Sequence, residues 1–151
     1  MRVLIVPAVV LFAVSTAQAG PNCGAFKGEI LFHCKIQGSS RQITICDVPN
    51  EQYLYQYGKP GQPPELQIQS SQKDVVYTPW NGVGNAIWAR LGFRNKGYLY
   101  DVGRSIEKGG QSPPEGFLDI YEPGNDTPIA TKQCQTGTVQ GDLDGLWDRF
   151  N

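Results

Sequence analysis

Short segments in which apolar and polar residues alternate recur along this chain, separated by turns rich in glycine and proline. The clearest is segment 87–94, in which Ile87, Leu91 and Phe93 share one face. A period of two is typical of a strand that buries one of its faces. With 18 Gly and 11 Pro in 151 residues, we expect turns rather than the helical crossovers of a parallel sheet. The pattern predicts a mainly β fold, a small antiparallel barrel or sandwich of about eight strands.

The C-terminal segment is the part of the chain with a helical pattern. Its apolar residues recur at i, i+3, i+4 and i+7: Leu143, Leu146, Trp147 and Phe150. Asp142 is placed to act as the N-cap. We expect one short helix over 142–150, docked on the sheet through these four side chains, because so short a helix needs tertiary packing.

The first 19 residues have the features of a secretory signal peptide. Met1-Arg2 provides a positive start, residues 3–14 are apolar except for Pro7, and Ala17-Gln18-Ala19 is a small-x-small cleavage site. We expect cleavage after Ala19, which leaves 20–151 as a single periplasmic or secreted β domain. The apolar run is shorter than the roughly 20 residues of a membrane span, so we expect no membrane insertion.

All four cysteines follow the predicted cleavage site: Cys23, Cys34, Cys46 and Cys134. An even number of exported cysteines favours two disulfides. A turn at 38–41 would bring Cys34 near Cys46, leaving Cys23 for Cys134; Cys23–Cys34 with Cys46–Cys134 stays open. The spacings contain no C-x-x-C pair, and the single histidine is adjacent to Cys34, so we expect no metal site.

Composition and motifs narrow the range of functions. The formal net charge of −1 argues against a nucleic-acid partner. We find no catalytic constellation, interpret His33 as structural, and expect neither an enzyme nor a cofactor. Two alternatives stay open, a purely structural envelope protein and a small exported hydrolase that uses clustered acids. The acids considered for the hydrolase are Glu65, Asp101, Glu107, Glu115 and Asp119.

Aromatic and basic residues gather around one loop and hairpin. They are Trp80, Trp88, Arg90, Arg94, Lys96 and Tyr98. Alternation places Trp88, Arg90 and Arg94 opposite the apolar face of their strand, with a tight turn at Asn95-Lys96-Gly97. Because Trp, Tyr and Arg dominate binding hot spots, we predict a binding face for a protein or cell-wall glycan partner. The row Tyr53, Tyr55 and Tyr57 fits a binding face or the core equally well.

Several segments resemble those of a family of small, exported, largely uncharacterised bacterial proteins, over roughly Glu29 to Cys134. They are Phe32-His33-Cys34, Ile43-Thr44-Ile45-Cys46, Tyr55-Gln56-Tyr57-Gly58-Lys59-Pro60-Gly61 and Phe93-Arg94-Asn95-Lys96-Gly97-Tyr98-Leu99-Tyr100. The chain is more distantly similar to the periplasmic lysozyme inhibitors, through Gly97 and Tyr98. The resemblance implies an exported β protein with an inhibitor-like loop at this hairpin.

Overall fold

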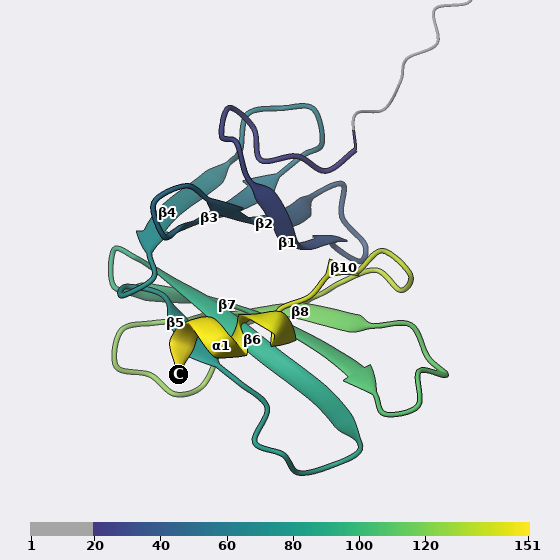
Figure 1. Ribbon diagram of the computed structural model, residues 1–151. Coiled ribbons are helices and arrows are strands. Elements are labelled where there is room, and N and C mark those ends of the chain that lie inside the picture. The colour runs from purple at the N-terminus through teal and green to yellow at the C-terminus, as the bar shows by residue number, and fades with distance from the viewer. Residues whose placement is uncertain (1–19) are drawn as a thin grey trace, which may run out of the picture.

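The computed structural model describes residues 20–151, so the predicted signal peptide lies outside the described residues. Ten strands form two antiparallel five-stranded sheets (Figure 1). The first sheet contains, in spatial order, β10 (Gln140–Gly141), β1 (Glu29–Lys35), β2 (Gln42–Val48), β3 (Gln52–Gly58) and β4 (Leu66–Ser71). The second contains β5 (Val76–Thr78), β6 (Ala86–Asn95), β7 (Tyr98–Glu107), β8 (Glu115–Tyr121) and β9 (Ala130–Gln133).

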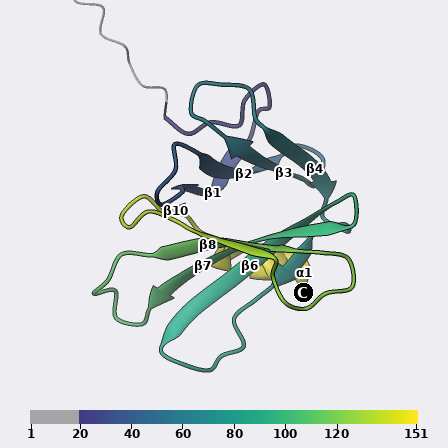
Figure 2. The ribbon, with the colours of Figure 1, turned by 180° about the vertical axis from the view of Figure 1, so that it is seen from behind.

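The predicted mainly β class is confirmed, and the two sheets remain separate layers when the molecule is seen from behind (Figure 2). Hydrogen-bonded pairing does not join the sheets into one closed barrel. The expected number of strands, about eight, is too low. A very short strand cannot be recognised from the sequence pattern. β10, for example, has only two residues and therefore shows no alternation.

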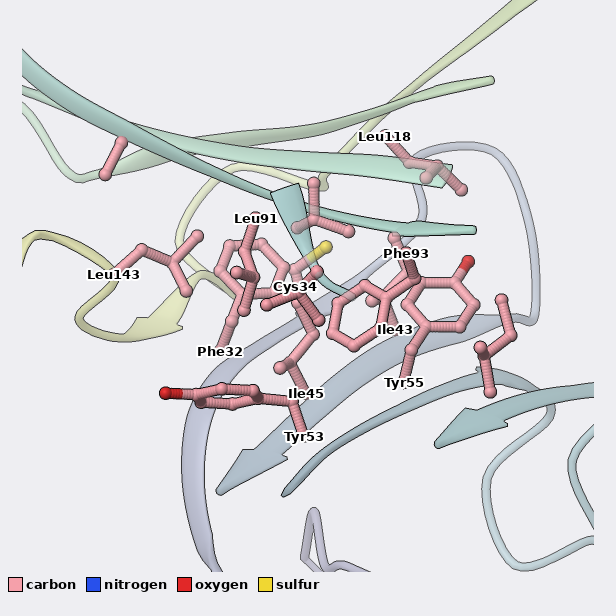
Figure 3. Packing of buried hydrophobic residues seen from close by; sticks show 14 of the residues in the cluster. Phe32, Cys34, Ile43, Ile45, Tyr53, Tyr55, Leu91, Phe93, Leu118 and Leu143 are labelled. Carbon is pink, nitrogen blue, oxygen red and sulfur yellow. The ribbon is translucent and has the colours of Figure 1, made fainter. Parts of the chain in front are cut away.

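The two sheets enclose one core that takes side chains from both (Figure 3). Tyr53 and Tyr55 on β3 are almost fully buried, and the ring centroid of Tyr55 lies 5.5 Å from that of Phe93 on β6. Tyr57, at the end of the same face, is half-buried and packs against this core. The tyrosine row therefore belongs to the core.

The predicted hairpin around Asn95-Lys96-Gly97 is present as β6 and β7. Asn95 pairs with Tyr98, so the turn has two residues, Lys96 and Gly97. Both have positive φ, 51° and 83°, as in the two-residue turns that match the twist of paired strands. A Cβ on Gly97 would also lie 2.8 Å from Pro123 Cγ, so the tip rests against the β8–β9 turn.

The C-terminal segment forms a 3₁₀ turn, η1 (Asp144–Leu146), and a single α-helical turn, α1 (Trp147–Phe150). Asp142 Oδ1 accepts a hydrogen bond of 2.8 Å from the Asp144 backbone N–H, but the N-cap of η1 is Leu143 and not the predicted Asp142. Among residues 20–151, no helix is long and apolar enough to cross a membrane.

Only part of the predicted docking face of this segment is buried. Leu143 and Leu146 lie in the core, and Phe150 stacks on Tyr77 with ring centroids 4.7 Å apart. Trp147, however, is 48% exposed, so its predicted burial is wrong. In a 3₁₀ turn residues three apart share a face, which aligns Leu143 with Leu146 and directs the next side chain elsewhere.

The structure pairs the cysteines as Cys23–Cys46 and Cys34–Cys134. Two disulfides are confirmed, but both pairings considered from the sequence are wrong. Register is one reason, because Cys34 lies opposite Ile43, three positions along β2 from Cys46. Sidedness is the other, because Cys34 belongs to the core between the sheets, whereas Cys46 belongs to a second apolar cluster. A bond between them would have to cross the sheet.

The two disulfides hold different parts of the fold. The bond between Cys34 and Cys134, with Cα atoms 5.7 Å apart, joins β1 of the first sheet to the residue after β9 of the second. The bond between Cys23 and Cys46 attaches the segment that precedes β1 to β2. One bond therefore links the two sheets, and the other secures the N-terminal segment.

Candidate functional site

The six predicted binding residues do not share one surface. Trp80 and Trp88 lie near the start of β6, whereas Lys96 and Tyr98 lie at the hairpin tip beyond its end. Six strand positions separate Trp88 from Arg94, which corresponds to about 20 Å along an extended strand. Arg94 and Lys96 are exposed at the tip, and Tyr98 is half-buried. The aromatic and basic ends of the predicted face are therefore separate places.

Arg90, between these two ends, is held in an ion-pair network. Its Nε donates to Asp101 Oδ2 at 2.7 Å, and its Nη2 donates to Asp119 Oδ2 at 2.8 Å. Its guanidinium carbon lies 4.9 Å from the ring centroid of Phe117. Arg90 therefore lies on the outward face that alternation predicted, but it is not a free cation, because side chains from β7 and β8 enclose it.

The same network brings together two of the acids considered for a hydrolase. Asp101 and Asp119 are paired across β7 and β8 and are both buried. Burial raises the pKa of Asp101, and the opposing effect of Arg90 does not cancel it. The Thr131 hydroxyl donates to Asp119 Oδ1 at 2.6 Å. The oxygens of this acid pair are thus largely occupied by the protein itself.

All three tryptophans of the chain line one hollow of about 300 Å³. It lies between the start of β6, the loop before it, β5 and the C-terminal segment. Its main lining residues are Tyr77, Trp80, Ile87, Trp88, Asp144 and Trp147. Residues 77–88 and the C-terminal segment, which is distant in sequence, therefore contribute aromatic surface to a single concave place.

Hydrogen bonds hold two of the aromatic walls in place. Trp80 Nε1 donates to the carbonyl of Val83 at 2.8 Å, and the Val83 backbone N–H donates to Asn81 Oδ1 at 3.0 Å. The Tyr77 hydroxyl donates to the carbonyl of Leu143 at 3.2 Å, tying β5 to the C-terminal segment. The loop before β6 is thus ordered by its own contacts, which pre-forms the wall that carries Trp80.

The polar side of the hollow is Asp144, whose side chain is 27% exposed. Its Oδ2 accepts from Arg104 Nη1 at 3.2 Å, and Asp142 Oδ1 lies 3.9 Å from the same nitrogen. Burial and the charge of Asp142 raise the pKa of Asp144, and Arg104 opposes them. Two buried atoms of this group, Asp144 Oδ1 and Arg104 Nε, have no hydrogen-bond partner among the described residues.

Tyr77, Asp144 and Trp147 are site residues that sequence reasoning missed. The helical spacing predicts that Trp147 docks on the sheet, and no sequence pattern assigns a site role to Tyr77 or Asp144. The sequence does contain one signal for this part of the site. Trp147 stands between two acids, Asp144 and Asp148, in a short C-terminal segment.

Comparison with protein-family models, with curated proteins and with solved structures gives no match.

Within the part of the chain that the structure describes, no three His, Cys, Asp or Glu side chains are grouped to hold a metal ion. His33 is buried in β1, with Nδ1 3.0 Å from Thr44 Oγ1. The lining residues of the aromatic hollow and their contacts indicate what it can bind.

Proposed function

We propose that this protein is an exported, non-catalytic binding module that contacts a protein or glycan partner through the aromatic hollow. The observation that carries the proposal is that all three tryptophans line this one place. Trp147 is nearly half exposed, and apolar surface gathered in one accessible hollow is typical of a binding site. Tryptophan is also among the residues that contribute most to binding free energy.

Export is part of the proposal. The two disulfides favour an oxidising compartment, and the first 19 residues have the pattern of a signal peptide. A periplasmic or secreted location agrees with both observations.

The acid pair gives less support to the hydrolase alternative. A hydrolase needs two carboxyl groups that reach a substrate, one of them free to donate its proton. Arg90 bridges Asp101 and Asp119, and Thr131 donates to the second. These contacts indicate a structural role for Asp101 and Asp119, which hold neighbouring strands together through Arg90 and Thr131.

The hairpin tip is a second candidate contact surface, separate from the hollow. The resemblance to lysozyme inhibitors assigns a contact role to Gly97 and Tyr98, which lie outside the hollow. Lysozyme is therefore one of the two probes that test the proposal.

The test uses the disulfide-bonded domain, residues 20–151, with two immobilised probes, lysozyme and peptide-free glycan strands of peptidoglycan. We expect at least one probe to bind, and Trp147→Ala to weaken that binding at least tenfold. Ile129→Ala is the matched control, because Ile129 is 50% exposed and lies before β9, outside the hollow. Failure of both probes to bind, or equal effects of the two variants, would overturn the proposal.

A further inference from the structure

One charged residue, Asp144, lines the hollow. The C-terminal segment contributes three acids, Asp142, Asp144 and Asp148, of which Asp144 lines the hollow and the other two are exposed. Arg104 is the cation paired with the first two, and its side chain is only 12% exposed. Arg104 therefore faces two carboxylates, and these three groups together carry one negative charge.

Aromatic faces beside a carboxylate are the features that recognise an organic cation. The negative face of an indole attracts an ammonium or guanidinium group, and tryptophan is the most effective residue for this contact. The protein already uses this chemistry, because Lys108 Nζ lies 4.4 Å from the ring centroid of Trp80. Among the described residues, no cation lies over the rings of Trp88 and Trp147, which also line the hollow.

The size of the hollow limits its occupant. At about 300 Å³ it lies at the lower end of small-ligand sites, so it fits one side chain better than several linked sugar rings. A cation would also gain Coulomb attraction from the carboxylate of Asp144, whereas a neutral sugar could gain only hydrogen bonds from it.

We propose that the hollow binds a basic side chain, an arginine or lysine of a protein partner, between Trp147 and the carboxylate of Asp144. This inference rests on the proposed function and specifies its partner. The aromatic walls cover the apolar stem of the guest, and Asp144 with its acidic neighbours attracts the charged end.

The experiment uses the three indole N–H signals of the ¹⁵N-labelled domain, 20–151, which report on the hollow directly even when binding is weak. The probes are a capped peptide with one central arginine and the same peptide with citrulline, which keeps the shape and removes the charge. The Trp147 signal, assigned by its loss in Trp147→Ala, should shift with the arginine peptide. The citrulline peptide should bind at least tenfold more weakly.

Two variants separate charge at the hollow from charge elsewhere. Asp144→Asn should weaken binding of the arginine peptide at least fivefold, and Asp142→Asn, at an exposed position, should weaken it less. Asp126→Asn, in the β8–β9 turn, is the matched control and should have no effect. If Asp144→Asn fails to fold, the comparison of arginine with citrulline on the unaltered protein decides the question.

The outcomes distinguish this inference from the proposed function. Equal shifts with both peptides, or shifts of the Trp147 signal with glycan strands and not with arginine, would overturn the basic-side-chain inference and leave the binding module intact. If neither peptide nor glycan nor lysozyme moves the Trp147 signal, both proposals are wrong.

Discussion

Asp101 and Asp119 lie directly opposite each other on β7 and β8, and Arg90 of β6 joins their carboxylates. Their neighbours along the strands, Val102 and Leu118, belong to the core, so this network occupies the outer face of the second sheet. The sheet thus has a polar, half-buried group on the side that sequence alternation assigned to solvent.

Replacing the cation of this network should destabilise the fold. Arg90→Ala leaves two opposed, buried carboxylates without their partner, and we expect a loss of about 3 kcal/mol in the free energy of unfolding. Arg94→Ala, at an exposed position on the same strand, is the control and should change stability by less than about 0.5 kcal/mol. Urea unfolding at pH 7 measures both. Equal stability of the two variants would show that the network contributes nothing.

The cost of Arg90→Ala should shrink as the pH falls. Burial raises the pKa of Asp101, and removal of Arg90 raises it further, because the arginine favours the charged carboxylate. A carboxyl group that holds its proton more tightly in the folded than in the unfolded chain stabilises the fold as it becomes protonated. The stability difference between variant and wild type should therefore be smaller at pH 4 than at pH 7. A difference that grows on acidification would contradict this account.

Gly103 on β7 is required by its neighbour on β8. Gly103 pairs with Phe117, and a Cβ at this position would collide with the Phe117 ring, which also lies beneath the Arg90 guanidinium. Gly103→Ala should cost about 1–3 kcal/mol, because the ring cannot stay in place. Gly145→Ala is the control, since its Cβ would meet no atom closer than 3.5 Å. Thermal unfolding of the two variants gives the comparison, and a tolerated Gly103→Ala would show that the ring moves freely.

The disulfide pairing is open to direct test. Peptide mapping under non-reducing conditions should yield linked peptides that contain Cys23 with Cys46 and Cys34 with Cys134. Loops of 23 and 100 residues imply losses of about 3 and 5 kcal/mol when each bond is removed, on the chain-entropy model. The double variant Cys34→Ser/Cys134→Ser should therefore be the less stable of the two. A linked peptide containing Cys34 and Cys46 would contradict this topology.

Two aromatic residues of the C-terminal helix should respond differently to truncation. Phe150 stacks on Tyr77 and packs against the core, so Phe150→Ala should cost at least about 2 kcal/mol. Trp147 is nearly half exposed, so Trp147→Ala should cost less than about 1 kcal/mol while reducing partner binding. Denaturant midpoints decide this, and a large loss for Trp147→Ala would place that side chain in the core.

Local features explain why parts of the fold were predictable. The β6–β7 hairpin follows from an alternating segment, a two-residue turn and a second segment, all contiguous in sequence. The burial of Leu143 and Leu146 likewise follows from a spacing of three residues within one turn. Local patterns were sufficient for these elements, although the same local spacing wrongly placed Trp147 among the docked side chains.

The candidate site could be predicted only in part. Trp80 and Trp88 were identified because they are close in sequence, but Trp147 joins them only when the C-terminal segment returns beside β5 and β6. Arg90 was placed in solvent because alternation gives the face of a side chain and says nothing about what neighbouring strands put beside it.

The sequence by itself determined the strand pattern, the turn chemistry and the presence of two disulfides, because each depends on residue types and short spacings. The tertiary structure alone decided the pairing of Cys34 with Cys134, the enclosure of Arg90 and the meeting of three tryptophans. Those relations join residues that lie on different strands or up to 100 positions apart. These relations depend on strand register, on the face that each side chain occupies and on the return of the chain end to β5 and β6. No short-range sequence pattern determines any of these three properties.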